Sequence, residues 1–169
     1  LVSLGSLFSE PVWLFYREDA AQRLRKALAL TSLAQLPGWR VSVGTPGSGV
    51  PQLMQRLFEA NALDPKALTL LHREHTPAVV EFLDGQVDAL VFASAPESLF
   101  VQMLLRTPGV KLFDFAQAEA YARRFAFLSP VVLPRGIVDL AADRPPQDVH
   151  LVAPTAMLVA RKDTHPALV

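Results

Sequence analysis

The amino-acid sequence repeats one local pattern: a short apolar strand, a turn rich in glycine or proline, and an amphipathic helix. The first copy predicts a strand at Arg40–Gly44, a turn at Thr45–Gly49 and a helix over Val50–Asn61. Within that helix, apolar residues recur three and four positions apart, which is the spacing of one buried face. These residues are Val50, Leu53, Met54, Leu57 and Phe58.

The second copy of the pattern follows directly. It predicts a strand at Leu68–His72, then a helix with Thr76 as its N-cap and Pro77 at its first position. Asp84 and Gly85 should end this helix. The residues expected on its buried face are Val79, Val80 and Leu83.

A third copy begins with a strand at Ala89–Ala93. Ser94 or Ala95 leads into Pro96 and a third helix, which Pro108-Gly109 interrupts. The residues expected on its buried face are Leu99, Phe100, Met103 and Leu104.

The remaining segments are less regular. Strands are expected at Pro11–Tyr16, Val110–Phe113 and Val149–Val152, the last continuing past an interruption near Pro154 to Ala156–Ala160. A helix is expected at Gln117–Phe125, and another within Glu18–Ala34 that ends near Pro37-Gly38. Leu128–Asp148 is rich in proline and arginine, which predicts a loop with a short strand at Val131-Val132.

Strands that alternate with helices of this length are typical of βαβ units. The sequence therefore predicts an α/β fold, with a mainly parallel sheet of about five strands and helices on both faces. The 169 residues leave room for about one domain of ordinary size.

Charge and cysteine content narrow the possible partners. Sixteen Lys and Arg residues balance sixteen Asp and Glu residues, and no basic cluster runs along one segment. Nucleic acid is not expected as a partner, because phosphate neutralisation needs a concentrated positive face. The absence of cysteine excludes disulfides and thiolate metal sites. No apolar run is long enough for a membrane-spanning helix.

Three turns of the repeated pattern should meet at one edge of the sheet, where ligands bind in parallel α/β folds. They are Thr45–Gly49, Glu74–Thr76 and Ala93–Pro96. Each leads into a helix whose first N–H groups favour an anion such as a carboxylate. The first turn is the best candidate, because its glycines allow close approach and Ser48 adds a hydroxyl. The predicted ligand-binding residues are Thr45, Gly47, Ser48, Gly49, Val50, Ser94, Pro96 and Glu10.

A purely structural interpretation of this turn stays open, in which Ser48 caps its helix and the glycines only form a tight turn. Other site types fail on spacing. Gly44, Gly47 and Gly49 match neither the dinucleotide fingerprint nor a P-loop, and Ser48 is not in a G-x-S-x-G elbow. His72 and His75 are separated by two residues where zinc-protease motifs need three. No catalytic residue, metal site or cofactor is predicted.

The scattered charged residues are expected on the solvated surface. They are Glu81, Asp84, Asp88, Asp139, Asp143, Arg123 and Arg124.

Several segments, in order along nearly the whole chain, resemble the TAXI family of TRAP-transporter solute-binding proteins, which have the type II periplasmic-binding-protein fold. They are Ser9–Arg17, Arg40–Gly49, Leu83–Ala89, Ala118–Phe125 with Leu128-Ser129-Pro130, and Leu151–Leu168. In that family two lobes joined by two crossing strands trap a ligand between them. The resemblance implies that residues 1–17 hold the outgoing hinge strand, residues 18–150 the second lobe, and residues 151–169 the returning strand and the start of a helix.

The resemblance further implies a protein outside the cytoplasm, free or membrane-anchored, that passes a small carboxylate or amino acid to a TRAP permease. Thr164 and Pro166 mark a helix start close to the last residue, so the chain is expected to be a piece that lacks the first lobe. Relatives often have a glycine before the proline of the third turn, where this chain has Ala95-Pro96-Glu97. The carboxylate of Glu97 would repel an anionic ligand if it faced the site. Two alternatives remain: an effector-sensing domain of a regulator, and an enzyme on the same scaffold.

Overall fold

The computed structural model describes residues 10–155 of the chain. They form two compact units, here named unit A and unit B. Unit A comprises Trp13–Phe92 and Arg106–Phe113, and the described part of unit B comprises residues 10–12, 93–105 and 114–155. The predicted strand at Ala156–Ala160 and the helix start at Thr164 lie outside the described residues.

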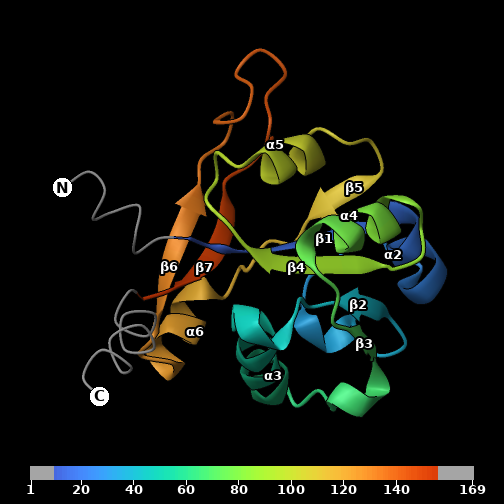
Figure 1. Cartoon of the computed structure of the whole chain (residues 1–169). Helices are drawn as coiled ribbons and strands as arrows, with labels where there is room; N and C mark the ends of the chain where they lie inside the picture. Colours follow the sequence, from blue (N-terminus) through green and yellow to red (C-terminus); the bar gives the residue numbers. More distant parts are fainter. Residues whose placement is uncertain (1–9, 156–169) are drawn as a thin grey trace. The chain divides into compact units, whose positions relative to one another are not determined.

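Unit A contains the first two copies of the strand–helix pattern and the strand of the third (Figure 1). Its strands are β1 (Val12–Arg17, of which Val12 belongs to unit B), β2 (Arg40–Ser42), β3 (Thr69–Leu71), β4 (Ala89–Ala93, of which Ala93 belongs to unit B) and β5 (Val110–Leu112). Its helices are α2 (Glu18–Arg25), α3 (Val50–Ala60) and α4 (His75–Leu83), with short 3₁₀ turns at Leu33–Gln35, Pro46–Ser48 and Pro65–Ala67.

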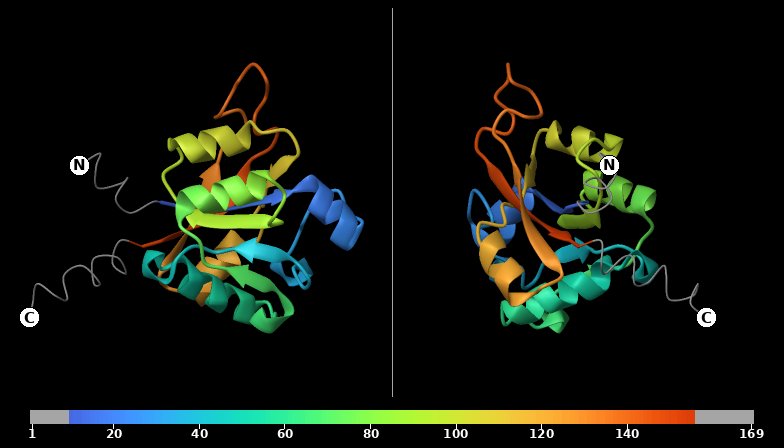
Figure 2. Two further views of the ribbon diagram at one scale, coloured as in Figure 1. Left: turned by 45° about the vertical axis from the view of Figure 1, so that its right-hand side comes forward. Right: turned by 90° about the vertical axis from the view of Figure 1, so that its left-hand side faces the viewer.

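The parallel part of the sheet lies in unit A, where the strand order is β3-β2-β4-β1. Val41 of β2 pairs in parallel with Leu70 of β3 on one side and with Ala89 of β4 on the other. The connection that contains α3 therefore leads from β2 to β3 on one side of it. The connection that contains α4 leads from β3 back across β2 to β4 on the other side. Because such crossovers are right-handed, the two helices cover opposite faces of the sheet (Figure 2).

Other strand pairs in the described chain are antiparallel. In unit A, Phe15 of β1 pairs with Leu112 of β5. In unit B, β6 (Leu128–Leu133) pairs with β7 (Val149–Pro154), and Val152 of β7 also pairs with Val12. The α/β class is confirmed, but among the strands of the described residues the parallel pairing is confined to β2, β3 and β4. The described residues contain seven strands rather than about five, because a loop instead of a helix joins β6 to β7 and lets the chain reverse.

β6 corrects the prediction of a loop with a two-residue strand at Val131-Val132. The six residues of β6 all have partners in β7, from Leu128 opposite Pro154 to Leu133 opposite Val149. Pro130 obscured this strand in the sequence, because proline cannot donate to a ladder. It is tolerated here since β6 ends the strand order, and an edge strand can lack an N–H donor.

Two helices have different ends from those predicted. Helix α2 ends at Arg25, well before Ala34, because Lys26 adopts a left-handed conformation (φ 51°) and its N–H bonds back into the last turn. Helix α4 begins at His75 with Glu74 as its N-cap, so Thr76 is not the cap and Pro77 is the third helical residue. Proline is harmless there, because the first N–H groups of a helix have no partner inside it.

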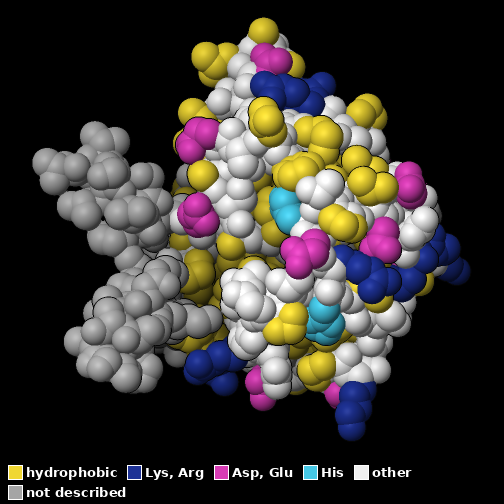
Figure 3. Space-filling view, viewed as in Figure 1, with side chains coloured by type: hydrophobic (Ala, Val, Ile, Leu, Met, Phe, Trp, Pro, Cys, Tyr) yellow, Lys and Arg dark blue, Asp and Glu magenta, His cyan; other side chains and the backbone are white. Residues whose placement is uncertain are grey.

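Helix α3 confirms the predicted buried face completely, since all five of its expected apolar residues are buried. In α4 the prediction is right only for Val79, which is buried together with Ala78 and Phe82. Val80 and Leu83 are 52% and 38% exposed, and hydrophobic side chains are visible at the surface over α4 (Figure 3). Phe82 and Leu83 follow Val79 by three and four residues, and both spacings are compatible with the same face of a helix. Periodicity alone therefore did not show which of the two is buried.

Unit B also contains α5 (Leu99–Leu105) and α6 (Ala118–Arg124), which confirms the helix predicted at Gln117–Phe125. In α5 the expected face is wrong for Leu99 and Met103, which are 87% and 39% exposed. The buried residues of α5 are Val101 and Leu104. Val101 therefore takes the inward position that the sequence pattern assigned to its neighbours.

Candidate functional site

The turn between β2 and α3 is the predicted centre of the site. Gly44 and Gly49 have positive φ angles of 85° and 80°, which L side chains rarely adopt. A Cβ on Gly44 would also lie 3.2 Å from the Ser48 hydroxyl oxygen. Gly47 is different, because its φ is not in the left-handed region and a Cβ there would meet open space. The sharp bend thus needs Gly44 and Gly49, while Gly47 leaves the outer side of the turn open.

The Ser48 hydroxyl is engaged within the turn. It donates to the Thr45 carbonyl over 2.7 Å and accepts from the Val50 N–H over 3.2 Å, at the first residue of α3. The N–H of Ser48 donates to Thr45 and that of Gly49 to Pro46. The N-cap residue of α3 is Gly49, and the Ser48 hydroxyl supports the helix start by accepting from its first N–H. A role of Ser48 in ligand binding stays a prediction.

Replacement of Ser48 by alanine should lower the free energy of unfolding by about 1 kcal/mol, because the Val50 N–H loses its acceptor. Urea denaturation monitored by circular dichroism measures the difference. Ser129→Ala is the control, since Ser129 is exposed on β6 and should change the stability by less than about 0.5 kcal/mol. Equal stability of wild type and Ser48→Ala would show that the hydroxyl does not support the start of α3.

The second predicted turn, Glu74–Thr76, enters α4 directly after β3 in unit A. Glu74 has an extended backbone, as expected of an N-cap, but its side chain makes no capping hydrogen bond. Thr76 lies inside the helix and is exposed. Because β2 and β3 are parallel, this turn and the turn at Thr45–Gly49 both follow carboxyl ends of strands.

The remaining predicted residues belong to unit B. The Ser94 N–H donates to the Pro11 carbonyl over 3.2 Å, which brings the segment of Glu10 close to the third turn. The carbonyl of Pro96 accepts from the side-chain amide of Gln102 over 2.9 Å. Glu97 and Glu10 are both exposed. The structure thus groups Thr45 to Val50 within unit A, and Glu10, Ser94 and Pro96 within unit B.

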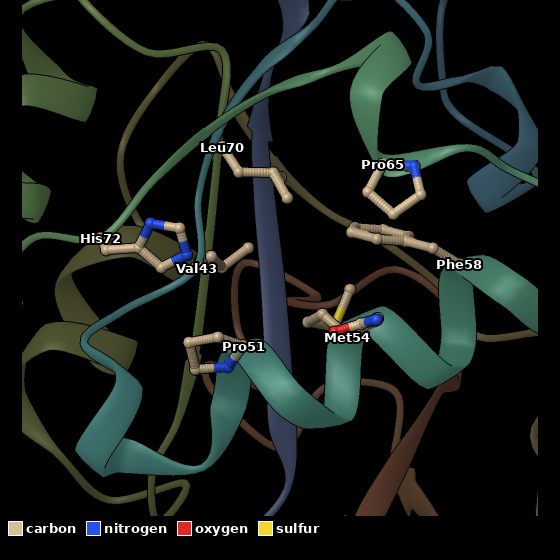
Figure 4. A pocket seen from close by; sticks show the side chains of 8 residues that line it. Val43, Pro51, Met54, Phe58, Pro65, Leu70 and His72 are labelled. Carbon is tan, nitrogen blue, oxygen red and sulfur yellow. The ribbon is translucent and has the colours of Figure 1, made fainter.

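A pocket of about 210 Å³ opens in unit A between α3 and the ends of β2 and β3 (Figure 4). It is close in sequence to the first turn, since Pro51 is the second residue of α3. Sequence reasoning missed it, because its walls come from four separate segments of the chain and its apolar residues on α3 were expected in the core. The lining residues are Val43, Pro51, Met54, Gln55, Phe58, Pro65, Leu70 and His72.

The prediction that Asp88 lies on the solvated surface is wrong, because its side chain is only 3% exposed. One carboxylate oxygen accepts from Arg23 and Arg40, each over 2.8 Å. The other accepts from the backbone N–H of Arg40 over 2.8 Å and from its guanidinium over 3.1 Å. We call Asp88, Arg23 and Arg40 the Asp88 cluster. It joins α2, the start of β2 and the segment before β4.

The environment of the Asp88 cluster shifts its ionisation. Burial of the Asp88 carboxyl disfavours its charge, but the hydrogen bonds from Arg40 and then Arg23 outweigh burial and hold the pKa below its ordinary value. The same contact raises the pKa of Arg40. The cluster is therefore ionised at neutral pH, and its role is to hold unit A together.

Asp114 and His150 form a second pair that sequence reasoning missed, in unit B. Asp114 Oδ1 lies 2.9 Å from His150 Nδ1 and accepts from the His150 backbone N–H over 2.7 Å. The Phe115 N–H donates in turn to the His150 carbonyl. Both side chains are almost half exposed. These contacts attach the segment after β5 to the start of β7.

His72 and His75, whose spacing does not fit a zinc motif, lie in different surroundings. His72 lines the pocket, whereas His75 packs edge-on against Phe92 with ring centroids 4.7 Å apart. Burial lowers the pKa of His75. Across residues 10–155, no three His, Cys, Asp or Glu side chains gather as a metal site would require. The helices of this range are also all too short to span a bilayer.

The sequence matches the model of a known protein family, and the structure is similar to several solved structures at low sequence identity. The model of the NMT1-like family matches residues 10–169. The chain is similar to the periplasmic aliphatic sulphonate binding protein SsuA from Escherichia coli, with 13% identity and a TM-score of 0.49, over 95% of this chain and 42% of that one.

Two further solved structures are similar to a smaller share of the chain. The alkanesulfonate-binding protein SsuA from Xanthomonas axonopodis pv. citri, bound to MOPS, has 20% identity and a TM-score of 0.48, over 69% of this chain and 40% of that one. A periplasmic binding protein from Brucella ovis with glutathione bound has 20% identity and a TM-score of 0.45, over 61% of this chain and 29% of that one. The chain spans less than half the length of each of these three proteins.

Proposed function

The chain belongs to the NMT1-like family, and we propose that it forms one lobe of an extracytoplasmic solute-binding protein that captures a small carboxylate or an amino acid. One observation carries this proposal. The parallel strands β2 and β3 are each followed by a turn and a helix, so two helix starts lie at the carboxyl-end edge of one sheet. Ligands of open α/β sheets bind at that edge.

The first turn is the proposed holder of the ligand's anionic group. Its outer side is open at Gly47, and α3 is the longest helix of unit A. The start of such a helix carries partial positive charge, which favours a carboxylate. Thr45, Gly47, Ser48, Gly49 and Val50 would surround the carboxylate, with the Ser48 hydroxyl turning from Thr45 toward the ligand.

The other proposed ligand-binding residues, Glu10, Ser94 and Pro96, belong to unit B and are considered by themselves. Glu10 would pair with a cationic group, such as the ammonium of an amino acid, because it is exposed and negatively charged. Ser94 would contribute a hydroxyl beside the segment that carries Glu10, and the ring of Pro96 an apolar surface. An amino acid carries both a carboxylate and an ammonium group, so amino acids are included among the ligands to be tested.

The proposal assigns no reaction to the chain. A second lobe, joined through hinge strands at residues 1–17 and 151–169, would close over the ligand, and a membrane permease would receive it. The resemblance to the TAXI family favours a TRAP-type permease and a location in the periplasm. With half of the enclosing surface supplied by another lobe, this chain alone should bind its ligand weakly.

The substitution Ser48→Asp tests the turn as the carboxylate site. Aspartate can still accept from the Val50 N–H but cannot donate to the Thr45 carbonyl, so the unfolding midpoint should fall somewhat while the chain stays folded. Its negative charge would lie beside the ligand's carboxylate and should weaken binding about tenfold or more. Titration calorimetry with a panel of amino acids and short carboxylates measures both the preferred ligand and this loss.

A matched charge control is Gln86→Glu, which adds the same charge next to the start of β4, the opposite end of the parallel strands. It should leave binding unchanged. Binding that is insensitive to Ser48→Asp would place the anionic group elsewhere. Absence of binding to every member of the panel, by this chain and by a chain that includes the second lobe, would overturn the proposed function.

A further inference from the structure

The outer edge of β3 is open in the sheet formed by residues 10–155. β3 ends the strand order, and β2 is its neighbour on the inner side (Figure 1). The N–H of Thr69 and the carbonyl of Leu71 bond to the residues that flank β2, each over 2.9 Å. Because successive residues of a strand direct their backbone groups to alternate sides, the N–H and C=O of Leu70 point away from β2. Those of His72 should do the same.

This edge lacks the features that usually prevent a strand from pairing with another chain. Such features include a proline, a charged side chain or a bulge on the edge strand. β6, at the other end of the strand order, carries Pro130. β3 consists of Thr69, Leu70 and Leu71, so it contains neither proline nor charge. Its outward backbone groups are therefore able to accept a further strand.

From this edge we propose that a second copy of the chain pairs antiparallel along β3, about a two-fold axis through Leu70. In this register, Leu70 of each copy donates to and accepts from Leu70 of the other. The His72 N–H of each copy donates to the Leu68 carbonyl of the other, because residues equally far before and after Leu70 face each other. The Leu68 N–H takes no part, since it already donates to the Pro65 carbonyl of its own chain.

Charge complementarity favours a second copy as the occupant. Lys66 lies four residues before Leu70 and Glu74 four residues after it, so the register brings Lys66 of each copy toward Glu74 of the other. Both side chains are exposed, and within residues 10–155 neither takes part in an ion pair. Arg73 does not compete for Glu74, because it pairs with Glu81 of its own chain. The edge thus complements itself in hydrogen bonds and in charge.

The pairing goes beyond the proposed solute binding and leaves the ligand turn at Thr45–Gly49 free. Since the two β3 strands run in opposite directions, the carboxyl-end edges of the two parallel sheets would lie on opposite sides of the dimer. The contact is short because β3 has three residues. We therefore expect a weak, reversible dimer, as is usual for interfaces below about 1,000 Å².

Sedimentation and amide hydrogen exchange of the 169-residue chain test the pairing. The weight-average mass should rise with concentration, from that of one chain toward that of two. In exchange measurements by NMR, the Leu70 and His72 amides should exchange several times more slowly at high than at low concentration, because the dimer engages them. The Thr69 amide is bonded within one chain, so its protection should not depend on concentration.

His72→Pro removes one of the outward N–H groups, and His72→Ala is its matched control, because it shortens the same side chain but keeps the N–H. His72 is exposed and follows the last residue of an edge strand, where proline is tolerated. His72→Pro should weaken the dimer about tenfold or more, since two symmetric hydrogen bonds are lost, and His72→Ala should change it less than about twofold. Circular dichroism and the urea midpoint check that both variants are folded.

Charge reversal tests the register without altering the backbone. Lys66→Glu places like charges opposite each other and should weaken the dimer about three- to tenfold at low ionic strength, with a smaller effect in high salt. Adding Glu74→Lys to the same chain restores opposite charges, so the double variant should recover wild-type association.

The mass of a single chain at every concentration up to about 1 mM, a dissociation free energy of about 4 kcal/mol, would overturn the pairing. A dimer equally strong in wild type, folded His72→Pro and Lys66→Glu would overturn it too, because such a dimer must use another surface. A double variant no stronger than Lys66→Glu would contradict the register. None of these variants alters the turn at Thr45–Gly49, so each result is independent of the proposed ligand site.

Discussion

Asp88→Asn should lower the free energy of unfolding by up to about 3 kcal/mol, the largest loss expected from a polar substitution in unit A. The carboxylate accepts hydrogen bonds at both oxygens from Arg23 and Arg40. An asparagine must turn an NH₂ group toward one of these donors, so a donor faces a donor. The guanidiniums are about half exposed and keep part of their hydration, which limits the loss. Urea denaturation at neutral pH measures it.

The same carboxylate makes the stability depend on pH. Because folding lowers the pKa of Asp88, its contribution is complete above the unfolded-state pKa of about 3.9 and is lost as pH falls through the lower folded-state value. Wild type should therefore lose this part of its stability in strong acid, and Asp88→Asn should lack that part of the pH dependence. Asp84→Asn is the control, because Asp84 is exposed and only four residues away. Similar losses in the two variants would contradict the role of the Asp88 cluster.

Phe82→Ala should lower the free energy of unfolding by about 3 to 5 kcal/mol, since it leaves a cavity as well as removing buried apolar surface. Phe82 is completely buried, in the inward face of α4. Thermal and urea denaturation of the variant give the change in stability.

The neighbouring residues of α4 provide the matched controls. Leu83→Ala and Val80→Ala remove side chains that are 38% and 52% exposed, so each should cost about 1 kcal/mol or less. The face predicted from the sequence alone would give the reverse order for Leu83 and Phe82. A larger loss in Leu83→Ala than in Phe82→Ala would therefore show that α4 is rotated relative to the structure.

Much of unit A could be predicted because its signals are local. Helix α3 has its apolar residues at regular spacing over three turns, and Pro51 and Gly49 mark its start, so both its bounds and its buried face follow from the sequence. The short helices α4 and α5 have too few turns for a unique face. Several apolar residues compete for the inward positions there, and packing against the rest of the unit selects Phe82 and Val101.

The site could be predicted only in part. Glycines and a serine between a strand and a helix identify the turn at Thr45–Gly49 from sequence alone, because a tight bend needs those residue types. The structure adds that the Ser48 hydroxyl bonds within this turn. Nothing local marks Asp88 as buried, since its two arginine partners lie 48 and 65 residues away along the chain.

The sequence by itself determined the α/β class, the order of the strands and helices along the chain, and the turn between β2 and α3, because these depend on residues close together in the chain. Only the tertiary structure decided how the strands pair, which side of α4 and α5 faces inward, and that Asp88 is buried between two guanidiniums. It also decided that Val43, Met54 and Leu70 enclose a pocket with His72 at its mouth. These features depend on contacts between distant segments, whose free energies arise only when the chain brings them together.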